Sequence, residues 1–244
     1  MDLIIDLGNT NRKLALFQNG KLAELYLLPE LSTKLIREFV ERHPVIEHCI
    51  LSSVINRPAA FNSFLGKRFN FIELNENTPV PIKNLYKEPK TLGKDRLAIA
   101  VAGAAIFPEK DVLVINMGSC ITYDFINNRN EYFGGAISPG MQMRFLALNT
   151  FTGKLPLVTH KETEELIGMD TENSVLSGIL NGISHEIEGT VAQYHKKYRG
   201  MKVILSGGDL IYFDKRLKIS IFAVPNIVLQ GLYQILAFNG NKTN

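Results

Sequence analysis

Reactive residue types gather in a short segment near the N-terminus, where an apolar run ends in a carboxylate. Residues 3–5 (Leu-Ile-Ile) are expected to form a strand buried on both faces, which would hold Asp6 at the end of a rigid element. Gly8 lets the backbone approach a ligand closely, and Asn9 and Thr10 add side-chain donors beside the N–H groups of the turn. This combination is typical of a nucleotide phosphate site. For the segment taken alone, an ordinary strand–turn–strand hairpin is the alternative.

The same arrangement occurs again in residues 112–125, where a second apolar run leads to Asn116, Gly118 and Ser119. Both segments continue through a second strand into a turn rich in Asn or Gly, the residues that tight hairpins require. The chain therefore contains two matching three-strand patterns. They predict a duplicated core whose two phosphate loops face each other across a cleft.

A third candidate is Asp95, which lies in the segment 93–96 (Gly-Lys-Asp-Arg). The preceding residues 79–92 contain three prolines and Tyr86, and we expect them to form a loop over a cleft. Segment 93–96 then opens an Ala-rich helix that is expected to be buried. An acid in the first turn suits the helix dipole, which is the purely structural explanation of Asp95. Arg96 keeps Asp95 ionised and could also grip a substrate anion or hydroxyl, so we favour a functional role.

Glycines recur where the chain must approach something closely. Segment 134–140 has paired glycines and ends in Pro-Gly, which indicates contact with a ligand or with a helix. Three more glycines lie along an expected helix over 170–198 and indicate tight packing, either within the subunit or across a dimer. Thr171, near the start of that helix, either caps it or binds a ligand. The Gly-Gly turn at 207–208 either leaves room for a nucleotide base or ribose or simply connects a strand to a helix.

The composition is that of a globular protein, with 45% hydrophobic and 21% charged residues in 244. A formal net charge of +3 is too small to predict nucleic-acid binding. The chain has no apolar stretch long enough to span a membrane and no signal-peptide pattern, so we expect a cytoplasmic protein without a membrane partner. Cys49 and Cys120 lack metal-ligand spacing and are expected to be reduced.

Alternating strands and helices are expected to position the candidate residues. In the first half, the elements after the three strands alternate helix, strand, helix, strand over residues 32–43, 48–54, 58–69 and 71–74. In the second half, the elements after the hairpin cover residues 141–150, 170–198, 203–206, 219–222 and 225–237. This pattern predicts an α/β protein with two halves, 1–110 and 111–244.

Together these motifs resemble those of type III pantothenate kinases, with matching order and spacing over essentially the whole chain. The resemblance rests on residues 6–10, 93–96, 118–119, 134–135, 139–140, 171–178, 206–208 and 225–232. It implies a duplicated ribonuclease-H-like (actin-like ATPase) fold, with two mixed-sheet half-domains around a nucleotide cleft. It also implies ATP-dependent phosphorylation of pantothenate, the first committed step to coenzyme A, by a bacterial cytoplasmic homodimer. The absence of a Walker-type loop disfavours a P-loop fold.

The resemblance also assigns roles to particular residues. The first ATP phosphate loop would comprise Asp6, Leu7, Gly8, Asn9, Thr10, Asn11, Arg12 and Lys13, with Ser119 in the second loop. Asp95 would be the catalytic base, and Asp6 would orient the Mg²⁺ that accompanies ATP. Pantothenate would be bound by Tyr86, Gly93, Lys94, Asp95, Arg96 and Thr171.

One position departs from the family pattern. The family usually has Asp where this chain has Asn116, the position that holds a monovalent cation, K⁺ or NH₄⁺, and Thr where it has Ser119. An amide keeps a carbonyl oxygen but loses the charge of a carboxylate, which puts the cation dependence in question. Two alternatives follow: a degenerate member that binds nucleotide or a partner protein without turnover, and a kinase for another small alcohol.

Overall fold

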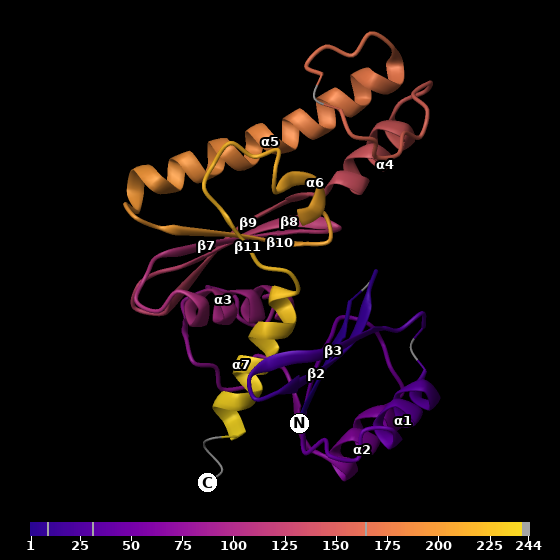
Figure 1. Ribbon diagram of the computed structural model, residues 1–244, viewed down its shortest axis with the longest axis vertical. Helices are drawn as coiled ribbons and strands as arrows, with labels where there is room; N and C mark the ends of the chain where they lie inside the picture. Colours follow the sequence, from indigo (N-terminus) through magenta and orange to yellow (C-terminus); the bar gives the residue numbers. More distant parts are fainter. Residues whose placement is uncertain (9, 31, 164, 241–244) are drawn as a thin grey trace. The chain divides into compact units, whose positions relative to one another are not determined.

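The computed structural model describes residues 1–8, 10–30, 32–163 and 165–240 and divides into two compact units (Figure 1). The first unit comprises Met1–Ile106 together with the C-terminal segment from Ile227 onward, and the second comprises Phe107–Asn226. None of the helices within the described residues has the length and apolar character needed to cross a membrane.

The sheet of the first unit mixes antiparallel and parallel strands, in the order β3-β2-β1-β4-β5. Its strands are β1 (Asp2–Leu7), β2 (Arg12–Gln18), β3 (Lys21–Leu27), β4 (His48–Ser53) and β5 (Asn70–Glu73). β1 pairs antiparallel with β2 and parallel with β4, so it lies in the middle of the sheet. Leu3, Ile4 and Ile5 are fully buried, which confirms the predicted strand with two covered faces.

The helices of the first unit are α1 (Thr33–Glu41), α2 (Ala59–Arg68), α3 (Lys94–Ile106) and α7 (Ile227–Gly240), with a two-residue strand β6 (Lys83–Asn84) before α3. α1 begins as predicted, because the Ser32 hydroxyl accepts a hydrogen bond from the backbone N–H of Leu35 at 3.4 Å. α3 is the expected buried helix, and its residues from Arg96 to Gly103 are all buried.

The C-terminal helix α7 packs on α3 rather than with the residues that precede it in the chain. A Cβ atom at Gly231 would lie 1.9 Å from the carbonyl oxygen of Ala98, so the two helices approach as closely as backbones allow. The sequence division at residue 110 grouped this helix with the second half, whereas its packing partners lie in the first unit.

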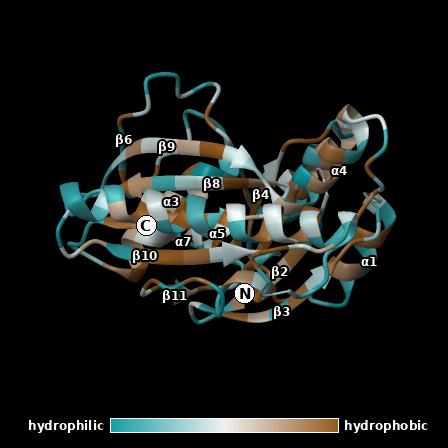
Figure 2. Ribbon diagram, turned by 90° about the horizontal axis from the view of Figure 1, so that it is seen from above, coloured by the Kyte–Doolittle hydropathy of each residue, from teal (hydrophilic) through white to brown (hydrophobic). Residues whose placement is uncertain are grey.

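The second unit repeats the plan of the first, with strands in the order β11-β10-β7-β8-β9. Its elements are β7 (Val112–Met117), β8 (Cys120–Ile126), β9 (Glu131–Pro139), α4 (Met141–Phe151), α5 (Thr171–Lys197), β10 (Lys202–Gly207), α6 (Leu210–Phe213) and β11 (Phe222–Ala223). The long helix α5 runs along one face of the sheet (Figure 1). β10 is mostly hydrophobic, whereas hydrophilic and hydrophobic residues alternate along α5 (Figure 2). The repeated strand order of the two units confirms the predicted duplication.

The glycine pair in β9 allows close contact with a neighbouring strand, not with a ligand or a helix as the sequence suggested. A Cβ atom at Gly135 would lie 1.7 Å from the carbonyl oxygen of Tyr123 on β8. The adjacent Gly134 has a φ of +92°, beside a register shift between these two strands. The glycines therefore let the two strands pair through an irregularity.

Candidate active site

Asp6 lies at the carboxyl end of β1, in a lateral row with Lys13 on β2 and Ser52 on β4. Burial, together with the negative charge of Asp95, raises the pKa of Asp6 to about 6. The Lys13 charge and a hydrogen bond with Ser52 act in the opposite direction. The first unit thus brings together two of the predicted site residues, Asp6 and Asp95, as neighbouring acids. Two neighbouring carboxylates attract a cation, and strongly perturbed pKa values cluster at functional sites.

The turn after β1 is tight. The Gly8 N–H donates to the carbonyl oxygen of Asn11 at 2.9 Å, and a Cβ atom at Gly8 would lie 3.0 Å from that oxygen. The side chains of Thr10 and Asn11 are exposed, whereas Leu7 is fully buried and offers only its backbone. The predicted phosphate-binding residue Asn9 lies outside the described residues.

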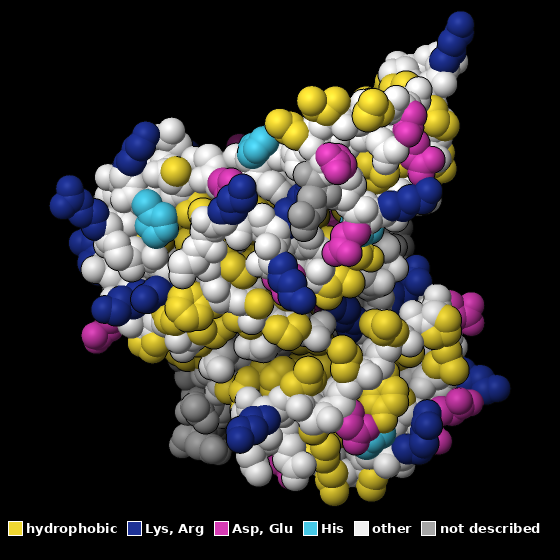
Figure 3. Space-filling view, turned by 45° about the horizontal axis from the view of Figure 1, so that its top comes forward, with side chains coloured by type: hydrophobic (Ala, Val, Ile, Leu, Met, Phe, Trp, Pro, Cys, Tyr) yellow, Lys and Arg dark blue, Asp and Glu magenta, His cyan; other side chains and the backbone are white. Residues whose placement is uncertain are grey.

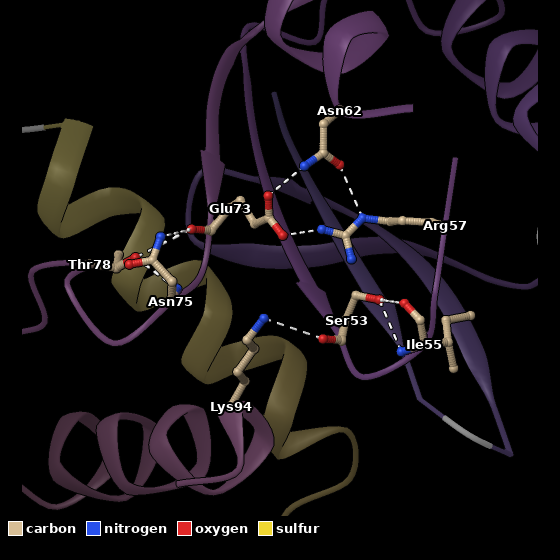
Figure 4. Close-up of polar contacts among 8 residues, drawn as sticks. All are labelled: Ser53, Ile55, Arg57, Asn62, Glu73, Asn75, Thr78 and Lys94. Carbon is tan, nitrogen blue, oxygen red and sulfur yellow. Dashed lines mark hydrogen bonds and ion pairs between the residues drawn. The ribbon is translucent and has the colours of Figure 1, made fainter. Parts of the chain in front are cut away.

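The start of α3 is held by short local contacts. The backbone N–H of Arg96 donates to Asp95 Oδ1 at 2.9 Å, and a Cβ atom at Gly93 would lie 2.6 Å from the same oxygen. The Lys94 ammonium donates to the carbonyl oxygen of Ser53 at 3.3 Å (Figure 4). Since Ser53 ends β4, this contact fastens the helix start to the sheet edge that carries Asp6.

Two of the residues expected to bind substrate lie together in the first unit. The guanidinium carbon of Arg96 lies 5.7 Å from the ring centroid of Tyr86, within the range of a cation–π interaction. Arg96 is only 5% exposed, so its orientation is fixed by its surroundings. The backbone N–H of Tyr86 donates to the Asn84 side chain at 2.9 Å, which anchors the loop.

A polar network supports the carboxyl ends of β4 and β5. Arg57 donates to Asn62 at 3.0 Å and pairs with Glu73, which also accepts from Asn62 (Figure 4). The Ser53 hydroxyl donates to the carbonyl oxygen of Ile55 at 3.0 Å. In the sequence, Ser52 and Ser53 are only a pair of small polar residues at the end of an expected strand. Their contacts to Asp6 and Lys94 depend on strand pairing and helix placement that no local pattern encodes.

In the second unit, Asn116 occupies the strand position that Asp6 has in the first. It lies in a lateral row with Thr122 on β8 and Ser206 on β10. Within the described residues, the buried hydroxyls of Thr122 and Ser206 have no hydrogen-bond partner. Three neutral oxygen-bearing side chains therefore share one row of the sheet.

The turn at Gly118–Ser119 rests directly on the end of β9. The Gly118 N–H donates to Cys120 at 3.0 Å, and the Gly140 N–H donates to the carbonyl oxygen of Ser119 at 3.1 Å. The Gly207 backbone, at a φ of +101°, passes so near Met117 that a Cβ atom would lie 2.1 Å from its carbonyl oxygen. Both sequence-predicted turns are therefore places of close backbone approach.

Thr171 lies in the second unit, at the first position of α5. Asp170, not Thr171, caps this helix, because its carboxylate accepts from the N–H of Asn173 at 2.8 Å. Thr171 is exposed and lines an apolar groove of about 1220 Å³ between α4 and α5. Of the two sequence alternatives for Thr171, the capping role is excluded and the ligand-binding role stays a prediction.

The carboxylates suit a metal ion carried by a nucleotide better than a resident metal. Among the described residues, no group of three or more His, Cys, Asp or Glu side chains could hold a metal ion. Mg²⁺ in kinase sites is usually bound through one or two carboxylates and the phosphates of the substrate. The half-buried Asp6, with Asp95 nearby, fits that pattern.

Comparison with known proteins gives a consistent result. Residues 2–193 match the family model of type III pantothenate kinases. The type III pantothenate kinase of Christiangramia forsetii is 44% identical over 246 aligned positions, which cover 98% of this chain and 99% of that protein. The corresponding enzyme of Phocaeicola vulgatus is 45% identical over 240 positions, again with 98% and 99% coverage.

A solved ROK family glucokinase from Streptomyces griseus shares the fold. Its TM-score is 0.54 over 97% of this chain and 99% of the glucokinase, at 11% identity. At that identity the likeness concerns the fold alone. It confirms the predicted actin-like ATPase fold with two mixed-sheet halves.

Proposed function

This chain belongs to the type III pantothenate kinase family, and from that premise we propose that it transfers a phosphoryl group from ATP to pantothenate in the bacterial cytoplasm. The product is 4′-phosphopantothenate, at the start of coenzyme A biosynthesis. The observation that carries the proposal is the pair of neighbouring acids Asp6 and Asp95. Phosphoryl transfer requires positioning, neutralisation of phosphate charge and an acceptor for the alcohol proton. Asp95 is the proposed proton acceptor, and Asp6 is the proposed residue that positions the Mg²⁺ accompanying ATP.

Asp95 takes the proton of the pantothenate hydroxyl. Its carboxylate is oriented by the N–H of Arg96 and by the absence of a side chain at Gly93. The N-terminal end of a helix also favours an anion. Lys94, bonded to the end of β4, keeps this helix start at the sheet edge, so the base is held on rigid elements.

Asp6 orients the Mg²⁺ that arrives with ATP. When bound, this ion would supply positive charge that offsets the charge of the phosphates. The residues of the chain hold the nucleotide around it. The proposed phosphate contacts are made by Asp6, Leu7, Gly8, Asn9, Thr10, Asn11, Arg12 and Lys13, together with Ser119 of the second unit.

Pantothenate is bound by the remaining predicted residues. The Tyr86–Arg96 pair supplies an aromatic face and a cation, and a guanidinium is well suited to a carboxylate such as that of pantothenate. Gly93, Lys94 and Thr171 complete the proposed set. The assignments of Tyr86, Gly93, Lys94 and Arg96 rest on the family pattern and on their clustering within the first unit, whereas that of Thr171 rests on the family pattern alone.

The monovalent cation is weakly held in this chain. Asn116, Thr122 and Ser206 offer oxygen atoms without a formal charge, and the two hydroxyls are buried and unpartnered within the described residues. Such a row could hold K⁺ or NH₄⁺ through dipoles alone. The charge–charge attraction that a carboxylate provides is missing.

A second copy of this chain covers the groove between α4 and α5. Hydrophobic side chains gather at the end of the second unit that carries α4 (Figure 3). Phe151 is 86% exposed and Met169 is 95% exposed, which is unusual for large apolar residues. Along α5, a Cβ atom at Gly178 or Gly182 would meet no described atom within 4 Å, so close packing inside the unit does not explain these glycines. A homodimer interface on this surface explains both features.

A coupled assay of ADP release with and without pantothenate tests the proposed function, with other small alcohols as alternative acceptors. The proposal predicts that only pantothenate stimulates ATP consumption strongly. Equal stimulation by another alcohol would assign the kinase a different substrate. Nucleotide binding without turnover is the less favoured alternative, because the catalytic carboxylate is present and the 44% identical relative is itself a pantothenate kinase. Tight ATP binding without pantothenate-dependent turnover would support that alternative.

A further inference from the structure

The second phosphate turn, Gly118–Ser119, has almost no freedom to move relative to the end of β9. Besides the hydrogen bond from Gly140 to Ser119, a Cβ atom at Gly140 would lie 2.0 Å from the carbonyl oxygen of Gly118 and 2.7 Å from that of Ser119. The φ of Gly140 is −71°, an angle that other residues adopt easily. A glycine is therefore needed here because of the close approach and not because of the backbone angle. Any displacement of the β9 end is therefore passed directly to Ser119.

The side chain of Arg144 binds that end of β9, in addition to its pairing with β8. Arg144, in the second turn of α4, donates through Nε to the carbonyl oxygen of Pro139 at 2.9 Å and through Nη2 to the Ser138 hydroxyl at 3.1 Å. A planar guanidinium can bond several acceptors at once in a fixed geometry. Arg144 therefore fixes both residues that lead into Gly140.

Arg144 is in turn held by Glu186 on α5. The two side chains form an ion pair, and the second carboxylate oxygen of Glu186 accepts from the Tyr123 hydroxyl at 2.9 Å. The side chains of Arg144 and Glu186 are 21% and 30% exposed, so the pair is partly shielded from solvent. Partial burial opposes ionisation of Glu186, but hydrogen bonds from Arg144, Tyr123 and Ser138 hold its pKa below the usual value. The carboxylate is consequently charged at neutral pH.

We propose that Arg144 and Glu186 are positioning residues for the reaction: they hold the end of β9 beneath the Gly118–Ser119 turn and so fix the place of the Ser119 hydroxyl. This inference rests on the proposed function, in which Ser119 contacts ATP. The hydrogen bonds of Arg144 and Glu186 link α4 and α5 to β8 and β9. The pair acts on nucleotide binding through the backbone that it supports.

The first test is Glu186→Gln, which removes the charge of the carboxylate and keeps the shape of the side chain. Freed of its counter-ion, Arg144 loses its fixed orientation, and we expect kcat/KM for ATP to fall about 10-fold, less than the roughly 100-fold that a 1 Å misplacement can cost. The KM for pantothenate should stay within about two-fold of wild type. Glu188→Gln is the matched control, because Glu188 lies on the same helix and accepts from the N–H of Lys218 at 2.7 Å, away from the turn.

The second test asks whether the effect passes through Ser119. In a Ser119→Ala background, Glu186→Gln should lower kcat/KM for ATP by a clearly smaller factor than in wild type, because coupled residues are not additive. Arg144→Lys is a second variant that keeps the positive charge but cannot bond all the acceptors of a guanidinium. It should reproduce the loss seen with Glu186→Gln.

The outcomes separate this inference from the proposed function. If the wild-type protein shows no pantothenate-dependent ATP consumption, the proposed function fails. If wild type is active but Glu186→Gln behaves like Glu188→Gln, the positioning role alone is wrong. Equal factors in the wild-type and Ser119→Ala backgrounds would also overturn it, as would equal losses for both substrates together with a lower Tm.

Discussion

The same strand position is surrounded by charged side chains in the first unit and by neutral side chains in the second. In the first unit, the position is occupied by Asp6, whose lateral neighbours are Lys13 and Ser52. In the second unit, the position is occupied by Asn116, whose neighbours on the corresponding strands are both hydroxyl residues. Each row thus contains a serine, but the second row has the neutral residues Asn116 and Thr122 where the first has the charged residues Asp6 and Lys13.

The difference shows that the duplication preserves backbone geometry and not charge. Strand order, hairpin and glycine turn recur in both units, but this strand position carries a half-buried carboxylate with a raised pKa in the first unit and a neutral amide in the second. We conclude that the negative charge at this strand position is confined to the first unit. In the second unit, burial also raises the pKa of Asp209 to about 6, but this acid follows the turn after β10 and is not part of the row of Asn116. The following predictions test this division.

The largest loss is expected for Asp95→Asn. Removal of the proton acceptor should lower kcat by about 10²–10⁴-fold, the usual contribution of a general base. ATP affinity should change little, because Asp95 is assigned to the acceptor alcohol. Single-turnover rates and equilibrium binding of ATP check the two parts separately. A near-wild-type rate would exclude Asp95 as the base.

A smaller and metal-dependent loss is expected for Asp6→Asn. An amide at this position should weaken the productive Mg·ATP complex by about 10- to 100-fold, a range typical of disturbed metal sites. Excess Mg²⁺ should partly restore the rate. Initial rates over a series of Mg²⁺ concentrations measure this effect, and a defect that is the same at all concentrations would place Asp6 away from the metal.

The raised pKa of Asp6 predicts a pH dependence in the same unit. Below about pH 6 this carboxyl group takes up a proton, so the affinity for Mg·ATP should fall as the pH is lowered through that value. Because the charge of Asp95 helps to raise this pKa, Asp95→Asn should move the decline to lower pH. Binding of Mg²⁺ with a non-hydrolysable ATP analogue, measured from pH 5 to 8, compares the two proteins. An unchanged profile in the variant would show that the two acids do not interact.

Local sequence patterns predicted much of this fold, because each relevant signal lies within a few residues. The Leu-Ile-Ile run at 3–5 and the Ser32 cap determine their own elements. The long helix expected over 170–198 is found at Thr171–Lys197, since its capping residue Asp170 adjoins an unbroken helical sequence. The duplication was visible because both hairpins use the same order of residue types.

What the sequence did not reveal depends on contacts between distant segments. The packing of α7 on α3 requires the meeting of Gly231 and Ala98, which are far apart in the chain. The hydrogen bond from Ser52 to Asp6 requires the pairing of β1 with β4. The role of Gly135 was misread, because a pair of glycines gives no sign of which backbone will pass beside it.

The most direct test of the division of charge is the response to K⁺ of the wild-type protein and of Asn116→Asp. An amide binds the cation less well than a carboxylate, and it also leaves one negative charge fewer for the cation to offset. Both effects predict that the initial rate of wild type depends only weakly on K⁺, whereas Asn116→Asp shows a steep and saturable rise. The rates are measured at saturating Mg·ATP and pantothenate, with ionic strength held constant by an inert cation. Strong saturable activation of the wild-type protein at low millimolar K⁺ would contradict the account.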